Sequence, residues 1–224
     1  MVKKTPRRTA ERILTSALQL FNRFGEPNVA TTLIASDLGI SPGNLFYHYA
    51  SKEQLVNTLF DAYQAEMLHL LPAAQDVRDM EDTWFFIHSL LELVWRYRFM
   101  YRDLNDLLSK NRHLESQVKQ ILALKQQAFE RLLANLHQAE LLAQTDLERG
   151  YCATQMVVML TWWLSYAYVR NPRHALEDNS ATHSVLNGAQ QLLSLVLPYL
   201  KPQPKTQLMG LLTVYNPPAD SASV

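Results

Sequence analysis

The chain has 224 residues, of which 48% are hydrophobic, and its 21 lysines and arginines equal its 21 acidic residues in number. These values exclude a disordered chain, and the length suits one small and one larger folded domain. Residues 1–52 carry seven basic and three acidic residues, a net charge of +4, whereas residues 53–224 carry 14 and 18, a net charge of −4. A basic segment joined to an acidic one directs one end of a molecule toward a polyanion such as DNA.

Apolar residues recur with helical spacing along nearly the whole chain, and no segment shows the sustained alternation typical of a strand. The sequence therefore predicts an all-α protein of about nine helices. In chain order, the predicted helices cover about residues 9–24, 32–38, 41–49, 51–70, 81–98, 100–109, 112–140, 145–170 and 181–199.

Local signals divide these helices into domains. Gly39 ends the second helix and Ser41 caps the third, which indicates a tight turn between them. We expect a three-helix domain over residues 1–52, joined by the fourth helix to a larger helical domain over residues 53–200. Repeated prolines predict a mobile or loosely docked tail over residues 201–224.

Cysteine content and the hydrophobicity of the segments indicate the cellular compartment of the protein. A single cysteine, Cys152, excludes an internal disulfide bond. The start of the chain shows no apolar signal segment, so we expect a cytoplasmic protein of bacterial type. Residues 150–169 carry no charge and are long enough to span a bilayer, but polar residues such as Thr154 and Gln155 penalise insertion. A buried core or subunit-interface helix is expected there, and no membrane partner.

Residues 41–52 concentrate side chains that can bond to phosphate or to base edges. These side chains are Asn44, Tyr47, His48 and Lys52. They follow a short helix that ends at Gly39, whereas Leu45 and Tyr49 fall at core positions of the same segment. This is the layout of a helix-turn-helix motif, whose second helix enters the major groove of DNA.

About the first 60 residues contain four elements at a specific spacing, which are Phe21…Phe24-Gly25, Thr31-Thr32 with Ile34-Ala35, Leu38-Gly39-Ile40-Ser41, and Gly43-Asn44-Leu45-Phe46-Tyr47-His48-Tyr49 followed by Ser51-Lys52-Glu53. In these elements and their spacing, the segment resembles the N-terminal domain of the TetR (tetracycline repressor) family of bacterial transcription factors. The rest of the chain agrees with the family only in helix number and order. There the resemblance implies a fold but no particular ligand.

The resemblance implies contacts to DNA, position by position. The implied contact residues are Thr31, Thr32, Ser41, Gly43, Asn44, Phe46, Tyr47, His48 and Lys52. The threonines, Tyr47, His48 and Lys52 would contact phosphate, while Asn44 would read a base edge.

Two positions depart from the family pattern. Pro42 stands where many relatives have a basic residue, and Phe46 stands where tyrosine is usual, which favours stacking or a thymine-methyl contact. Basic residues before the first helix can supply the missing charge by reaching the DNA backbone or the minor groove. They are Lys3, Lys4, Arg7 and Arg8.

No pattern in the sequence indicates an enzyme, a metal site or a cofactor. The seven histidines form no HxxxH or HExxH motif, and the six glycines form no phosphate-binding loop. We therefore expect no catalytic residues, no metal and no cofactor.

Two aromatic helix faces suggest a pocket for a small effector molecule. At helical spacing, one face carries Trp84, His88, Leu91 and Trp95, and the other carries Gln155, Met159, Trp162 and Tyr166. If these faces flank a cavity, they would bind a small hydrophobic or aromatic effector. The alternative is plain core packing, because aromatic stripes at helical spacing usually pack in a core.

A subunit interface is expected near the end of the larger domain, since one short helix reads too few base pairs for one genomic site. The predicted interface combines the charge-free helix with a stripe on the last helix, formed by Val185, Leu186, Ala189, Leu192, Leu193 and Val196. The expected function is a homodimeric, ligand-responsive repressor that binds a palindromic operator. The alternative is a ligand-independent DNA-binding protein that acts through a protein partner, in an architectural or cell-cycle role.

Overall fold

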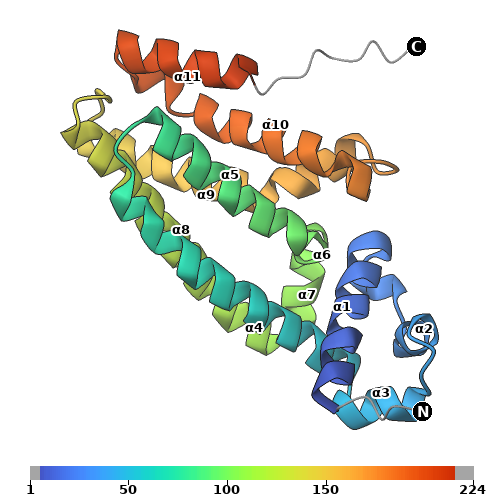
Figure 1. The fold of residues 1–224 in the computed structure, drawn as a ribbon. Coiled ribbons are helices and arrows are strands. Elements are labelled where there is room, and N and C mark those ends of the chain that lie inside the picture. Colours follow the sequence, from blue (N-terminus) through green and yellow to red (C-terminus); the bar gives the residue numbers. More distant parts are fainter. Residues whose placement is uncertain (1–5, 215–224) are drawn as a thin grey trace, which may run out of the picture.

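The computed structural model describes residues 6–214, and this part is built from α-helices joined by short turns (Figure 1). The helices are α1 (Pro6–Phe24), α2 (Thr31–Asp37), α3 (Pro42–His48), α4 (Lys52–Leu70), α5 (Met80–Arg96), α6 (Arg98–Arg102), α7 (Leu104–Lys110), α8 (Arg112–Gln138), α9 (Asp146–Arg170), α10 (Ala181–Ser194) and α11 (Pro202–Val214). The expected all-α fold, with an N-terminal helix-turn-helix and a larger helical part, is confirmed.

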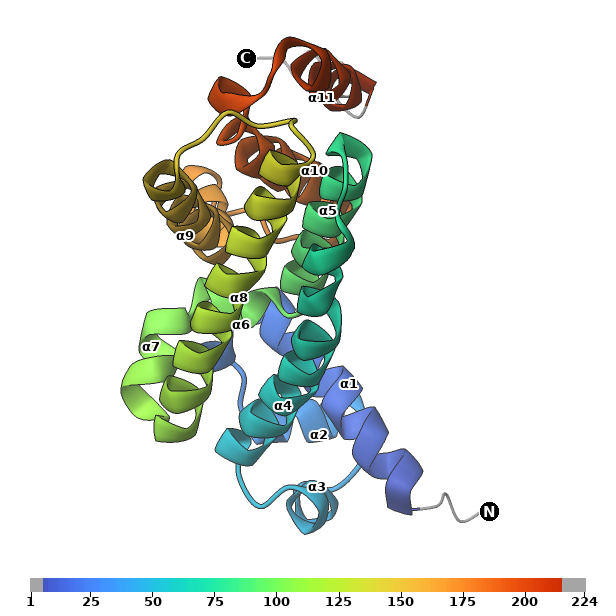
Figure 2. The same cartoon turned by 90° about the vertical axis from the view of Figure 1, so that its left-hand side faces the viewer.

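Helices α1, α2 and α3 form a small unit, here called the head, at one end of the molecule (Figures 1 and 2). Its core contains Phe21 of α1, Ile34 of α2 and Leu45 of α3, all fully buried. Gly39 supplies the turn between α2 and α3 with a φ of +63°, a conformation that glycine adopts without strain. The head is therefore held by its own core and by a tight turn.

Helix α4 leads from the head into the second unit, here called the body, which comprises α5 to α11 (Figure 1). Its start is capped because the Ser51 hydroxyl accepts a hydrogen bond from the Gln54 amide at 3.1 Å. The Gln54 side chain in turn accepts from the Ala50 amide at 2.7 Å. The two side chains thus cap the start of α4 reciprocally, with the return bond made to the residue before Ser51.

The body is a layered helical bundle. Helix α8 packs between α4 and α9, and α10 packs against α5 and α9. The start of α9 is fixed by a capping box in which Thr145 and Glu148 satisfy each other's backbone groups. Within residues 6–214, every helix is too short or too polar to span a bilayer.

The C-terminal segment differs from the predicted tail. Residues 202–214 form α11, which lies on α5 at the end of the molecule opposite to the head (Figure 2). Leu208 is fully buried there, and the Gln190 side chain donates to the Leu212 carbonyl at 3.3 Å. Pro202 is at the first helical position, where a missing N–H costs nothing, so this proline begins a helix instead of preventing one. The rest of the predicted tail, residues 215–224, lies outside the described residues.

Candidate DNA-binding interface and ligand cavity

Helix α3 presents an exposed surface at the tip of the head (Figures 1 and 2). Leu45 and Tyr49 are buried, as expected, and the Tyr49 hydroxyl donates to the Ala10 carbonyl of α1 at 3.4 Å. The opposite side is free, since Tyr47 is 81% exposed and Phe46 is 45% exposed. The same helix therefore anchors to the core by one side and offers the other to a partner.

The start of α3 is preorganised by Ser41. Its hydroxyl accepts a hydrogen bond from the Asn44 backbone amide at 3.2 Å, which caps the helix, and Asn44 is exposed. A β-carbon on Gly43 would meet nothing closer than the Ser41 hydroxyl, at 4.0 Å. The backbone at Gly43 is thus open to close approach by a nucleic acid.

Four other predicted contact residues lie on α2 and α3. The Tyr47 and His48 rings meet edge to face with centroids 5.1 Å apart. Thr31 and Thr32 begin α2, where Thr31 is half-buried and Thr32 is exposed. All four residues therefore belong to the helix-turn-helix of the head.

Lys52 has a protein partner that the sequence analysis did not predict. Its ammonium forms an ion pair with the Glu26 carboxylate at 2.8 Å and donates to the Glu26 carbonyl at 3.0 Å. Lys52 is therefore neutralised by a protein group and joins the start of α4 to the turn after α1. Its predicted contact with phosphate stays a prediction, and the structure adds that the ammonium is paired with Glu26.

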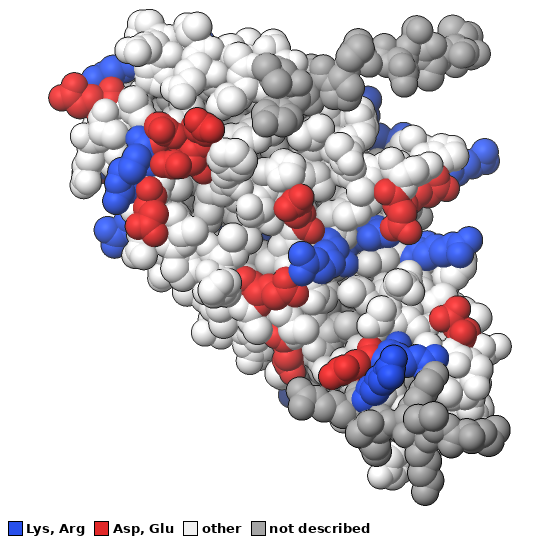
Figure 3. Space-filling view, viewed as in Figure 1, with Lys and Arg blue, Asp and Glu red and all other residues white. Residues whose placement is uncertain are grey.

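Of the four basic residues before the first predicted helix, Arg8 lies in α1 and is exposed. Lys3 and Lys4 lie outside the described residues, and only the backbone of Arg7 is described. Figure 3 shows basic and acidic side chains side by side along the boundary between head and body.

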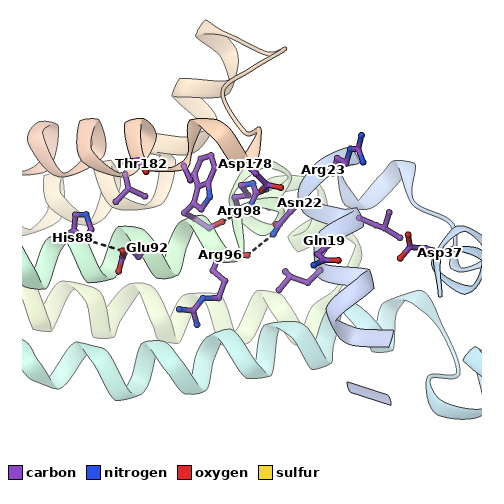
Figure 4. Close-up of a pocket in the computed structure, with 15 residues that line it drawn as sticks. Gln19, Asn22, Arg23, Asp37, His88, Glu92, Arg96, Arg98, Asp178 and Thr182 are labelled. Atoms are coloured by element: carbon purple, nitrogen blue, oxygen red, sulfur yellow. Dashed lines mark hydrogen bonds and ion pairs between the residues drawn. The ribbon is translucent and has the colours of Figure 1, made fainter. Parts of the chain in front are cut away.

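A cleft of about 820 Å³ lies at that boundary, between α1, α5 and α10 (Figure 4). Its wall is polar, and Asn22 of α1 donates to the Arg96 carbonyl of α5 at 2.9 Å. His88 and Trp95 line the cleft, whereas Trp84 and Leu91 are only 2% exposed and pack in the core. The first aromatic face is thus divided between core and an open, charged cleft.

The second predicted effector face points outward. Trp162 and Tyr166 are 39% and 54% exposed, Gln155 is exposed and Met159 is half-buried, and all four line an open groove over α9 and α10. The two predicted faces therefore do not flank a common cavity, and that prediction is wrong. Helix α9 is apolar on most sides, so periodicity alone did not identify the side that faces the core.

The predicted dimer stripe on α10 is also misplaced. Five of its residues are at most 6% exposed and Leu186 is half-buried, because α10 packs against α5 and α9 of the same chain. The five are Val185, Ala189, Leu192, Leu193 and Val196. They form protomer core and are not available to a second subunit.

The structure reveals a buried polar cluster that the sequence analysis missed. Lys125 of α8 is 1% exposed, and its ammonium donates to the Tyr101 hydroxyl of α6 at 3.1 Å. The Tyr101 hydroxyl is in turn hydrogen-bonded to the Tyr63 hydroxyl of α4. The buried hydroxyl of Thr161, on α9, has no hydrogen-bond partner among the described residues.

These four side chains line one small cavity of about 20 Å³, here called the Lys125 cavity. Its other walls are apolar and come from Phe60, Met100, Leu104, Val118, Ile121 and Leu122. Burial lowers the pKa of Lys125 to about 7, and it raises the pKa values of Tyr63 and Tyr101, which stay neutral. The available signal in the sequence was a lysine at an apolar-stripe position, seven residues after Val118 and four before Phe129.

Helix α6 connects the Lys125 cavity to the head. On one side Tyr101 enters the cavity, and on the other Phe99 packs on Phe21 of α1 with ring centroids 5.3 Å apart. The Asn22 side chain accepts from the Phe99 amide at 3.1 Å, and the Asp103 carboxylate accepts from the Glu26 amide at 3.3 Å. A shift of α6 would therefore move its contacts with α1 and with the turn that follows α1.

Metal chemistry has no evident site in this part of the chain. Between residues 6 and 214, no group of three or more His, Cys, Asp and Glu side chains is placed to hold an ion.

Comparison with known families covers both units. Residues 13–59 match the family model described as bacterial regulatory proteins of the tetR family, and residues 62–208 match the model described as a bacterial transcriptional repressor. The two matches together include α2, α3 and nearly all of the body.

Solved structures give the same result. A TetR-family transcriptional regulator from Marinobacter aquaeolei VT8 is 30% identical, with a TM-score of 0.79, over 93% of this chain and 99% of that chain. CprB from S. coelicolor A3(2), a TetR family protein, is 15% identical with a TM-score of 0.68, over 94% and 97% of the two chains. A tetR-family regulatory protein from Rhodococcus RHA1 is 18% identical with a TM-score of 0.57, over 87% and 98%.

At the two lower identities, the likeness shows the fold alone. The two family models and the Marinobacter relative carry the assignment, and they agree with the exposed helix α3 on a separate head. The chain therefore belongs to the TetR family of bacterial transcription regulators, which are DNA-binding proteins and not enzymes.

Proposed function

We propose that this regulator is a homodimeric repressor that binds a palindromic operator and leaves it when a small molecule occupies the body. The observation that carries the proposal is the position of α6, which contacts both the Lys125 cavity and the head. The description of the matched family model supports repression as the mode of action.

The DNA contact is assigned to the exposed side of α3 and its neighbours. Asn44 reads a base edge, Phe46 contacts a base face or a thymine methyl group, and Tyr47 with His48 contacts phosphate. Ser41 and Gly43 position the start of the helix, and Thr31 with Thr32 contacts the backbone from α2. Lys52 acts indirectly, by fixing the start of α4 on Glu26.

The subunit interface is assigned to an exposed apolar stripe on α9, here called the α9 face. It consists of Leu147, Tyr151, Val158, Trp162, Tyr166 and Val169, which are between 39% and 79% exposed. Successive positions lie three or four residues apart, except for a step of seven between Tyr151 and Val158, where the exposed residues Thr154 and Gln155 are polar. An exposed apolar stripe of this kind marks a protein interface, and a two-fold axis across it pairs α9 with its copy.

Dimerisation places two copies of α3 on one DNA duplex. Half-sites read by such a pair lie one helical turn apart, about 34 Å, or a multiple of it. A ligand that prefers the conformation with the wrong separation releases the operator by shifting the population of dimers.

Release has a physical route through α6. A molecule that widens the Lys125 cavity displaces Tyr101 and Met100 of α6. Because Phe99 of the same helix packs on Phe21, this displacement also moves α1. The Asp103 bond to Glu26, and the Glu26 pair with Lys52, extend the route to the start of α4.

The test is selection of bound fragments from random DNA, followed by footprinting of the recovered site. We expect a palindrome whose protection is lost on addition of a small molecule. Many dispersed sites, with binding that no small molecule alters, would instead favour the ligand-independent protein that acts through a partner.

A further inference from the structure

The Lys125 cavity contains a cation without an anion. Among residues 6–214, no carboxylate lies within ion-pair distance of the Lys125 ammonium, and its hydrogen bond goes to the neutral Tyr101 hydroxyl. A buried ammonium is costly unless a negative charge or several acceptors compensate it. The fold itself supplies neither.

A second donor in the same cavity, the Thr161 hydroxyl, lacks a hydrogen-bond partner among the described residues. The Thr161 hydroxyl is buried, lines the cavity and makes no hydrogen bond within the described part of the chain. Buried polar atoms are nearly always satisfied, so an unsatisfied hydroxyl beside an uncompensated ammonium indicates a missing acceptor. The Lys125 ammonium comes from α8 and the Thr161 hydroxyl from α9, and both residues line the Lys125 cavity.

The remaining walls define the rest of the ligand. They are aliphatic or aromatic and include Phe60 of α4, Met100 of α6 and Leu122 of α8. One ammonium balances one negative charge, so a monoanionic carboxylate fits better than a dianionic phosphate, which would leave a buried charge uncompensated.

We propose that the effector is a small carboxylic acid with an apolar body, whose carboxylate binds Lys125 and Thr161 in this cavity. The proposal rests on the ligand response proposed above and adds the chemical class of the ligand. The carboxylate accepts from the Lys125 ammonium and the Thr161 hydroxyl, and Tyr101 and Tyr63 complete the polar end of the site.

Binding requires the cavity to widen. Its volume of about 20 Å³ holds roughly one water molecule, which is far less than an acyl chain or an aromatic ring needs. Met100 and the half-buried Leu122 are adaptable walls, since methionine repacks easily and Leu122 reaches the surface. Widening at Met100 moves α6, so the same event that admits the ligand acts on the head.

The experiment compares acids with matched amides on the full chain by isothermal titration calorimetry. The probes are octanoate and phenylacetate against octanamide and phenylacetamide. We expect the acids to bind wild type at least about tenfold more tightly than the amides. Lys125→Met should remove this preference, and Thr161→Val should weaken acid binding by about fivefold.

Lys119→Met is the matched control. Lys119 is on the same helix but is exposed and paired with Glu115, so its removal changes the net charge equally without touching the cavity. This variant should bind the acids like wild type. Amides that bind as tightly as acids, acids that bind Lys125→Met unchanged, or the absence of acid binding up to about 10 mM would each overturn the proposal.

A second measurement does not depend on a variant. Since the carboxylate needs the charged amine, acid affinity should fall from pH 7 to pH 9, whereas amide affinity should stay constant. The titratable groups that face Lys125 are Tyr101 from α6 and Tyr63 from α4, and both stay neutral over this range. Acid affinity that is independent of pH would contradict the proposal even if a variant failed to fold.

A measurement of operator release distinguishes a failure of the carboxylate site from a failure of the proposed ligand response. If acids bind through Lys125 but do not release DNA, the chemical class stands and the ligand response fails. If a neutral molecule releases DNA from wild type and from Lys125→Met alike, the response stands and the carboxylate site fails.

Discussion

The guanidinium of Arg102 occupies the position that a β-carbon on Gly25 would take, with only 1.3 Å between the ideal β-carbon and Nη2. Gly25 has a φ of +85°, which side chains rarely adopt. Arg102 is held there by Asp103 at 3.1 Å and by the Tyr168 ring. The close approach of α6 to the turn after α1 therefore depends on this glycine.

Gly25→Ala should destabilise the protein and weaken the contact between α6 and the head. Strained φ costs about 1–3 kcal/mol, and displacement of the Arg102 side chain adds to it. The measurement is the free energy of unfolding in urea at fixed protein concentration. Gly210→Ala is the control, since this helical glycine has free space around it, and it should leave stability unchanged or raise it by up to about 1 kcal/mol. If Gly25→Ala and Gly210→Ala changed the free energy of unfolding equally, the contact between Arg102 and the turn at Gly25 would not contribute to stability.

The recognition surface gives the second prediction. Asn44→Ala should weaken operator binding by about 1–3 kcal/mol and relax the preference for one base pair, because the variant loses a contact to a base edge. The unfolding midpoint should stay unchanged, since the Asn44 side chain is exposed. Fluorescence anisotropy with the selected operator and its single-base variants measures both quantities. Met209→Ala, at the exposed far end of the molecule on α11, should bind DNA like wild type.

The ion pair between Lys52 and Glu26 gives the third prediction. Lys52→Met should lower the free energy of unfolding by about 1 kcal/mol, because it leaves the Glu26 carboxylate without its ion pair. The salt dependence of DNA binding should keep its slope, since this lysine is already neutralised by Glu26. A free phosphate contact would instead reduce the slope of log K against log salt by about one. A reduced slope for Lys52→Met would therefore support the phosphate contact predicted from sequence and contradict the neutralised state.

The helix-turn-helix could be predicted from sequence because its signals are local. Gly39 at the turn, Ser41 at the cap and the buried Leu45 are each set by neighbours a few residues away, and the structure places all three as expected. The DNA contacts proposed for α3 come from the same segment and stay a prediction. Lys52 is different. Glu26, the partner of Lys52, is distant in sequence, and no local pattern predicts that ion pair.

The faces of the body could not be predicted, because they depend on which helices meet. Helix α9 is apolar on both its inner and outer sides, so spacing did not separate Trp163, which is buried, from Trp162, which is exposed. On α10 the stripe is a true apolar stripe, but α5 and α9 of the same chain cover it. The burial of Lys125 could not be predicted for the same reason, because it requires the packing of α4, α6 and α9 around α8.

The α9 face gives the fourth prediction. Trp162→Glu should convert the proposed dimer to a monomer at micromolar concentration, because it introduces a charge into the exposed apolar α9 face. Analytical ultracentrifugation measures the assembly state. Phe85→Glu is the matched control, because Phe85 is 56% exposed but is on α5, outside the α9 face. The α9 face would lose its assigned role if Trp162→Glu stayed dimeric, or if Phe85→Glu dissociated equally.

Lys125 gives the last prediction, on stability against pH. In the folded chain its pKa is about 7, below the ordinary value of 10.5 expected in the unfolded chain. Between these values the unfolded chain binds more protons, so this group makes the free energy of unfolding rise with pH, by at most about 1.4 kcal/mol per unit. Below pH 7 the amine is charged in both states and its burial cost is greatest.

Lys125→Met removes this cost, because methionine has a similar shape and no charge. The variant should therefore be more stable than wild type at pH 6, and its advantage should shrink steadily as the pH rises from 7 toward 9. Urea unfolding of both proteins at several pH values, at one protein concentration, measures the difference. If the advantage were the same at every pH, the buried amine would not be the group that titrates. If Lys125→Met were less stable at pH 6, the ammonium would hold the fold together and would not be a site reserved for a ligand.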